Sequence, residues 1–123
     1  MANPNLAAIT TITGSLGQVS LSTTSATSLI NNAASSGTII KVESIVVTNT
    51  SASAAAITIN SYSAASLGGT AYPLASTISV PANAALIVTD KSTSFYLTEN
   101  TSLGATAGTA GSLTVTTAWE IMS

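Results

Sequence analysis

A strict alternation of side chains near the C-terminal end restricts the fold of this chain more than any other feature. In the run SLTVTTAWEIM, alternate positions carry Leu113, Val115, Thr117, Trp119 and Ile121. The positions between them carry Thr114, Thr116, Ala118, Glu120 and Met122. A period of two is typical of a half-buried β-strand, because successive side chains of a strand point to opposite faces of its sheet. We therefore predict a strand over residues 113–122, with Trp119, the only Trp, as a core anchor.

Similar short runs recur along the chain, and no segment repeats apolar residues at the 3.6-residue spacing of a helix. Many short strands separated by turn residues are typical of antiparallel sandwiches. The sequence therefore predicts an all-β fold, a single antiparallel β-sandwich or jelly-roll domain. The other strands are expected over residues 18–23, 39–50, 55–60, 77–80, 85–89, 94–98 and 103–107.

We predict that the chain divides into an extended N-terminal arm over residues 1–16 and the sandwich domain over residues 17–123. The segment carries spaced apolar side chains and is too small to fold alone. We expect it to be docked, because chain ends are usually disordered unless they are held in place. It either docks on the sandwich or on another subunit, or it is an ordinary edge strand of the same domain.

The long strand over residues 39–50 changes its pattern after Glu43, from apolar residues on one side to apolar residues on both. Either a β-bulge shifts the register there, or another segment covers the outer face of the later half. Under the second explanation, Ile45 and Val47 of this strand are candidate contacts with a neighbouring subunit or a capsid. The apolar residues of the arm are candidates for the same contact: Leu6, Ile9 and Ile12.

Composition excludes several classes of function. The chain has no Cys and no His, which excludes zinc sites, iron–sulfur clusters and thiol nucleophiles. Lys41 and Lys91 are the only basic residues, too few for a surface that neutralises nucleic-acid phosphates. The chain has no run of about 20 apolar residues, which is the length needed to span a membrane. We expect no cofactor, no metal, no nucleic acid and no membrane among its partners.

We also expect no enzymatic activity and no catalytic residue. A Ser or Thr nucleophile needs a base, and only a Lys could serve here. No S-x-x-K or G-x-S-x-G motif occurs, and the four carboxylates are scattered along the chain. Two N-T-S triplets, at residues 49–51 and 100–102, match the N-glycosylation pattern, but we interpret them as turn chemistry.

The shortage of charge has its own consequence. Charged residues make up 5% of the chain, against about 25% in typical soluble proteins. Net charge is what keeps soluble proteins apart, and the formal net charge here is −2. Such a chain is easiest to explain if much of its exterior is covered in an assembly.

Three stretches resemble small virion proteins of tailed bacteriophages: GTIIKVESIVVTNTSASAAAITINSY, TISVPANAALIVTDKSTSFYLTENTSLGATA and SLTVTTAWEIMS. Together they extend over about residues 37–123. Two features depart from the pattern of that group. The turn at residues 99–102 reads Glu-Asn-Thr-Ser where Glu-Gly-Asp-Ser is usual, and a single acidic residue, Glu120, follows Trp119.

The resemblance implies a noncatalytic virion structural protein, first of all a capsid decoration or cement protein that binds and stabilises the shell. Its partners would be the major capsid protein or other virion proteins. It would form a homo-oligomer, a trimer by analogy, on the capsid surface after synthesis in the host cytoplasm. One alternative is a neck, tail or fibre-associated protein of the virion.

Another alternative is a carbohydrate-binding module for host attachment. Tyr62 and Tyr72 flank a Gly-Gly loop at residues 61–73 and could stack on a sugar. The simpler explanation is that both rings pack at the base of that loop.

Overall fold

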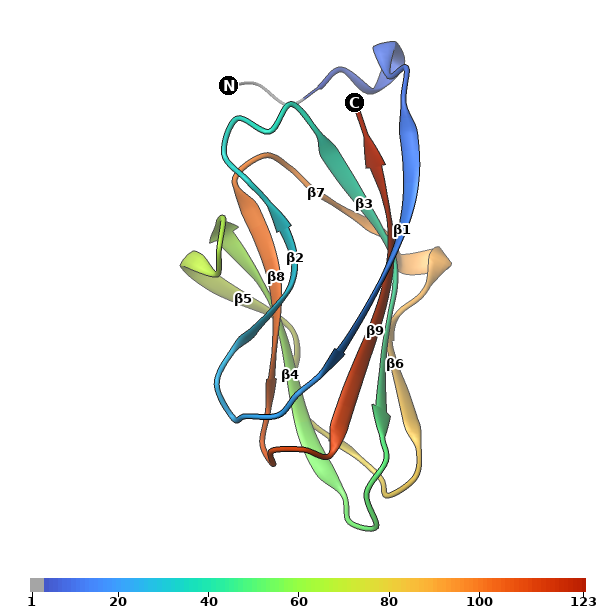
Figure 1. Cartoon of the computed structure of the whole chain (residues 1–123), viewed down its shortest axis with the longest axis vertical. Coiled ribbons are helices and arrows are strands. Elements are labelled where there is room, and N and C mark those ends of the chain that lie inside the picture. The colour runs from blue at the N-terminus through green and yellow to red at the C-terminus, as the bar shows by residue number, and fades with distance from the viewer. Residues whose placement is uncertain (1–3) are drawn as a thin grey trace.

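Two antiparallel sheets pack face to face in the computed structural model, which describes residues 4–123 (Figure 1). We call them sheet A and sheet B. Sheet A has the order β1 (Ile12–Ser20), β9 (Leu113–Met122), β3 (Ile39–Asn49) and β6 (Ala85–Thr89), and β7 (Phe95–Leu97) also pairs with β3. Sheet B has the order β2 (Thr27–Asn32), β8 (Thr101–Ala107), β4 (Ala55–Ala64) and β5 (Gly68–Val80). Two 3-10 helices complete the described chain, η1 (Leu6–Ala8) and η2 (Lys91–Thr93). The prediction of an all-β antiparallel sandwich is confirmed.

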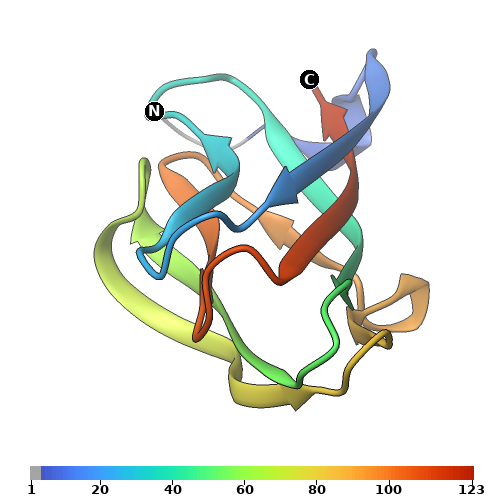
Figure 2. The ribbon, with the colours of Figure 1, turned by 60° about the horizontal axis from the view of Figure 1, so that its bottom comes forward.

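The chain crosses between the sheets at most of its connections, as Figures 1 and 2 show. The core lies between the sheets because alternate side chains of β3, β4 and β9 point inward. Its buried apolar members come from both sheets and include Leu21, Ile30, Ile40, Val42, Ile45, Val47, Ile57, Ile59, Val80, Leu97, Leu103, Leu113 and Val115.

Two elements of sheet B differ from the sequence-based expectation. β2 was not expected, because a register shift between Ser28 and Ile30 breaks its alternation and buries Leu29 and Ile30 together. The expected loop over residues 61–73 is largely a hairpin between β4 and β5, in which Ser61 pairs with Tyr72. Its turn holds Ser66 and Leu67 at φ of 57° and 59°. Neither residue type signals such a turn, so the residues at the turn did not predict the hairpin.

The N-terminal segment joins sheet A instead of standing apart from it. The amides of Thr10 and Thr11 donate to the carbonyl of Ser123, and the Ser123 amide donates to the carbonyl of Thr11. From Ile12 onward the chain pairs with β9 through Ser20 without a register shift. The expected boundary between residues 16 and 17 therefore falls inside β1, and residues 12–16 form an edge strand of the same domain. The first three residues of the expected arm lie outside the described residues.

The change of pattern in β3 is a β-bulge at Glu43. Val42 pairs with Trp119 and Ser44 pairs with Ala118, so Glu43 is the extra residue. An extra residue reverses which alternate positions face the core. Val42 therefore points inward before the bulge and Ile45 points inward after it, and both are fully buried. Of the two explanations left open by the sequence, the bulge is confirmed.

Trp119 lies at the rim of the core, packed against it but only partly buried. Its indole lies over Gly17 of β1, where a Cβ would approach Trp119 Cζ3 to 2.8 Å and Cη2 to 2.9 Å. Glycine in a strand interior is normally destabilising relative to alanine. Here the close approach of the indole, and of the buried Thr117 Oγ1 at 2.9 Å from the same Cβ position, requires it.

Two buried asparagines hold the ends of the sandwich together. The Asn49 amide nitrogen donates to the carbonyls of Ser53, at 2.8 Å, and Val80, at 3.0 Å. Its oxygen accepts from the amide of Ser51 at 2.9 Å. At the other end, the Asn32 amide nitrogen donates to the carbonyls of Thr38 and Leu97. The interpretation of the triplet at 49–51 as turn chemistry is confirmed.

We predict that Gly17→Ala lowers the free energy of unfolding by about 1–3 kcal/mol, because the new methyl group overpacks against the indole. In a Trp119→Ala background the same change should cost clearly less, since the indole contacts are gone and only the contact with Thr117 Oγ1 at 2.9 Å remains. Urea denaturation of the four proteins in a double-mutant cycle measures the difference. Equal losses in both backgrounds would contradict the predicted contact.

We predict that Asn49→Ala lowers the free energy of unfolding by about 1–3 kcal/mol, because the buried Val80 carbonyl and the partly buried Ser53 carbonyl lose their donor. Asn60→Ala, at a half-buried position of β4, is the matched control and should change it by no more than about 0.5 kcal/mol. Thermal or urea denaturation monitored by Trp fluorescence measures both. A loss of equal size in the two variants would refute the role given to Asn49.

Candidate functional site

Charged groups form no chemical centre in the described part of the chain. The ion pair found there joins Lys41 Nζ to Glu43 Oε1 at 3.5 Å, and both side chains are partly exposed, so the pair adds little to stability. No group of three or more acidic, His or Cys side chains within residues 4–123 could hold a metal ion. The helices there are η1 and η2, each of three residues, and neither could cross a membrane.

Asp90 has a local structural role. Its carboxylate accepts hydrogen bonds from the Ser92 hydroxyl, at 2.6 Å, and from the Ser92 amide, at 3.0 Å. These bonds favour the charged form and lower the pKa of Asp90, the hydroxyl contributing most. The arrangement caps η2 between β6 and β7.

The residues predicted as intersubunit contacts separate into two groups. Ile45 and Val47 are 0% exposed and belong to the core, so they cannot contact another subunit. This corrects the expectation for both, and the reason is the bulge at Glu43, which turns them inward. Leu6 and Ile12 are exposed, and Ile9 is half-buried.

β1 presents an apolar surface on the outer face of sheet A. Its alternate residues Ile12 and Leu16 are 62% and 65% exposed, whereas Val19 packs against the core. Across the same face, Leu16 pairs with Ala118, which pairs with Ser44. No charged side chain occurs in β1. Leu16 was not among the predicted contacts, because glycines at positions 14 and 17 weaken the apolar alternation around it.

β1 is also an open edge. It pairs with β9 on one side, and no strand of the described residues pairs with its other side. Its nine residues contain no Pro and no charge, and its ladder has no bulge. An edge strand of this kind is a template for pairing with another chain, because alternate N–H and C=O groups face outward without partners.

The other sheet edges are protected by their geometry. β2 is short and has a register shift. β5 contains Pro73 and three register shifts against β4. The free edge of β3 is divided between β6 and β7, which have five and three residues and are separated by η2. Short strands, Pro and bulges are the devices that block edge pairing. β1 lacks all of them.

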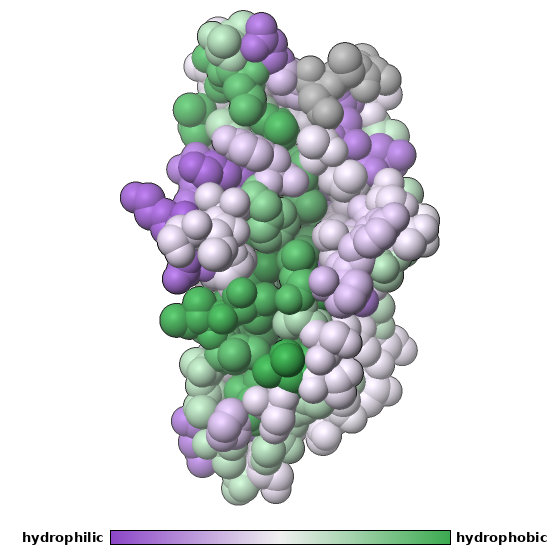
Figure 3. Space-filling view, turned by 180° about the vertical axis from the view of Figure 1, so that it is seen from behind, coloured by the Kyte–Doolittle hydropathy of each residue, from purple (hydrophilic) through white to green (hydrophobic). Residues whose placement is uncertain are grey.

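Hydrophobic residues are not confined to β1. Figure 3 shows a lengthwise hydrophobic band on the face seen from behind, where β5 and β6 lie. The exposed large hydrophobic residues of these two strands are Tyr72, Leu74, Ile78 and Ile87. The band lies at the edge of the sandwich opposite β1 and β2, as Figures 1 and 2 show together.

Comparison with known proteins gives similarities of fold only. No protein-family model and no curated protein matches this chain. One similar solved structure is described as "Bacillus endospore appendages form a novel family of disulfide-linked pili". It is 20% identical, covers 91% of this chain and 87% of that chain, and has a TM-score of 0.48. Another is described as "Structure of infectious bursal disease virus Gx strain", with 13% identity and a TM-score of 0.45. That match covers 89% of this chain and 33% of the viral chain. At these levels of similarity no function follows for this chain.

Proposed function

We propose that this chain is a noncatalytic structural protein of a bacteriophage virion, a capsid decoration or cement protein that joins neighbouring subunits through β1. The observation that carries the proposal is the open, uncharged edge of β1 with two exposed apolar side chains beside it. The resemblance of residues 37–123 to small virion proteins of tailed phages supports the identification with a virion.

The geometry of β1 suits strand addition. A strand from a neighbouring subunit could pair with the free edge through backbone hydrogen bonds, each of which contributes about 0.5–1.5 kcal/mol net. The exposed side chains of Ile12 and Leu16 would be covered by the same neighbour. The backbone bonds would supply affinity, and the two apolar side chains would fix the register.

A second copy of this chain is the neighbour that fits best. If two β1 strands pair antiparallel about a two-fold axis at Gly14, Ile12 of one copy lies beside Leu16 of the other. Both apolar side chains are then covered in a single self-complementary contact. An uncharged surface sets no electrostatic barrier to such self-association. Because each copy has one open β1 edge, this contact closes as a dimer.

The position in the virion is tested by quantitative mass spectrometry of purified particles of the source phage. We expect a copy number comparable to that of the major capsid protein, as a decoration protein requires. A copy number far below it would indicate the neck, tail or fibre alternative. Absence of the protein from the particle would overturn the proposal of a virion role.

We predict that the purified protein is a homo-oligomer and that Leu16→Lys raises its dissociation constant about tenfold or more, because a charge must be desolvated at the contact. Light scattering on a sizing column measures the mass over a range of concentrations. Ile87→Lys, a substitution of an equally exposed residue of β6 on the same sheet, is the matched control and should leave the mass unchanged. Equal effects of the two substitutions would show that β1 is not the contact.

A further inference from the structure

A pocket of about 210 Å³ opens between the two sheets, at the edge where β5 and β7 face each other. Every Tyr of the chain and its single Phe line this pocket. Aromatic residues make up 4% of the sequence, so their collection around one pocket is not a consequence of abundance. The remaining lining residues are Ser61, Ser63, Leu74, Leu97 and Thr101.

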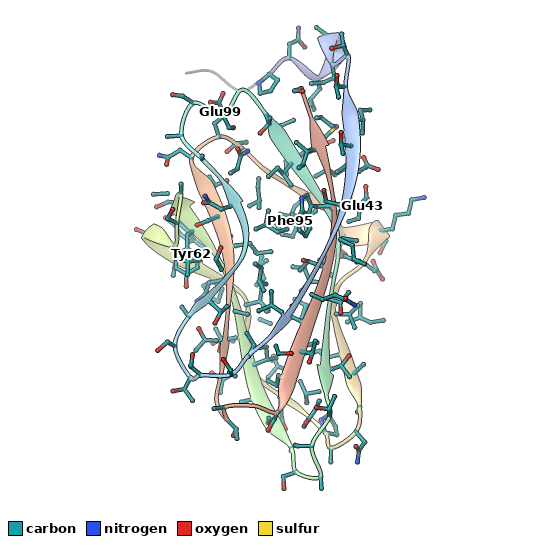
Figure 4. The ribbon with its side chains drawn as sticks, in the orientation of Figure 1. Glu43, Tyr62, Phe95 and Glu99 are labelled. Atoms are coloured by element: carbon teal, nitrogen blue, oxygen red, sulfur yellow. The ribbon has the colours of Figure 1, made fainter. Side chains whose placement is uncertain are left out.

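The aromatic side chains have different parts in this arrangement. Phe95 comes from β7 and lies between the sheets, where it packs against the core (Figure 4). Tyr62 lies on the side of sheet B, and its Cε2 atom is 3.1 Å from the position that a Cβ of Gly104 would take. The packing explanation therefore holds for the Tyr62 ring. Tyr72 and Tyr96 are 57% and 47% exposed and are free to contact a ligand.

The polar groups of the pocket are all uncharged. Ser63 Oγ accepts from the Thr70 amide at 2.7 Å and keeps its own hydrogen for donation. Thr101 Oγ1 donates to the Thr98 carbonyl at 2.7 Å and keeps its lone pairs as acceptors. The tyrosine hydroxyls can do both. A charged ligand would find no counter-charge among the lining residues, whereas a neutral polyhydroxyl compound would find donors and acceptors.

We propose that this pocket binds one neutral sugar ring. A pyranose has apolar C–H faces that can lie against Phe95, Tyr72 and Leu74, and hydroxyl groups at its edge for the Ser, Thr and Tyr hydroxyls. The volume is below the range of about 300–1,000 Å³ that accommodates drug-sized ligands, so it suits a single ring. A Pro-rich peptide also binds aromatic side chains, but it needs an extended groove with several successive sites.

The sugar site is independent of the proposed assembly through β1. The pocket lies at the β5–β7 edge of the sandwich, and β1 is the edge strand of sheet A on the other side of β9 and β3. A subunit joined through β1 would therefore leave the pocket accessible. Many subunits on one particle could hold a glycan-bearing surface by avidity, even when each site binds weakly.

The test is a titration of the ¹⁵N-labelled protein, followed by NMR chemical shifts, with glucose, galactose, mannose and N-acetylglucosamine as separate probes. We expect at least one sugar to shift amide signals of β5 and β7 in a saturable way, with a dissociation constant on the order of millimolar for a single ring. If none of the four sugars gives a saturable shift there, or a Pro-rich peptide does so instead, the proposal is overturned.

Variants separate binding from folding. Tyr72→Ala should raise the dissociation constant about tenfold by removing one aromatic wall, and Tyr72→Phe should retain most of the affinity. Ile87→Ala, at an exposed apolar residue that does not line the pocket, is the matched control and should bind as the unmodified protein does. The NMR spectra themselves report whether each variant is folded. Unchanged affinity in folded Tyr72→Ala would also refute the site.

Discussion

The sandwich depends on the bulge at Glu43 in β3. β3 is the central strand of sheet A and pairs with β9 on one side and with β6 and β7 on the other. Without the extra residue, Ile40 and Val42 could not face the core together with Ile45 and Val47, because side chains alternate strictly along a regular strand. One unpaired residue therefore decides whether the strand contributes to a single continuous core. The exposed ion pair of Glu43 with Lys41 is a minor consequence of the same geometry.

A chain with so few charges must protect its sheet edges by other means. The described edges of β2 and β5 use register shifts and Pro73, and the edge beside β3 uses two short strands. Register shifts, Pro and short strands interrupt the backbone hydrogen bonding along the edge itself. A charged side chain leaves that hydrogen bonding intact and disfavours only the pairing of another strand. β1 is regular, uncharged and apolar on its exposed side, which makes its open edge a feature to be explained by a partner.

The two proposals concern opposite edges of the sandwich. Strand addition would use the backbone of β1, and sugar binding would use side chains from β5 and β7 where the sheets separate. Both rest on the same property of this chain, an exterior of small hydroxyl and apolar side chains with very little charge. Such an exterior selects neutral partners, because a charged ligand finds no counter-charge there.

The sequence by itself determined the sandwich and most of its strands, because alternation is local and can be read along a single strand. Residues 113–122 show this most clearly, and the broken pattern at Glu43 located an irregularity without distinguishing its cause. The hairpin at residues 61–73 escaped prediction because Ser66 and Leu67 are not residues that signal a turn with positive φ. Ile45 and Val47 were predicted to lie at the surface because the sequence does not show which face of the sheet the residues after a bulge occupy.

Only the tertiary structure decided which edge remains open and that Tyr72, Phe95 and Tyr96 share one pocket. Edges and pockets depend on which distant strands become neighbours, and the period of a single strand contains no information about its neighbours.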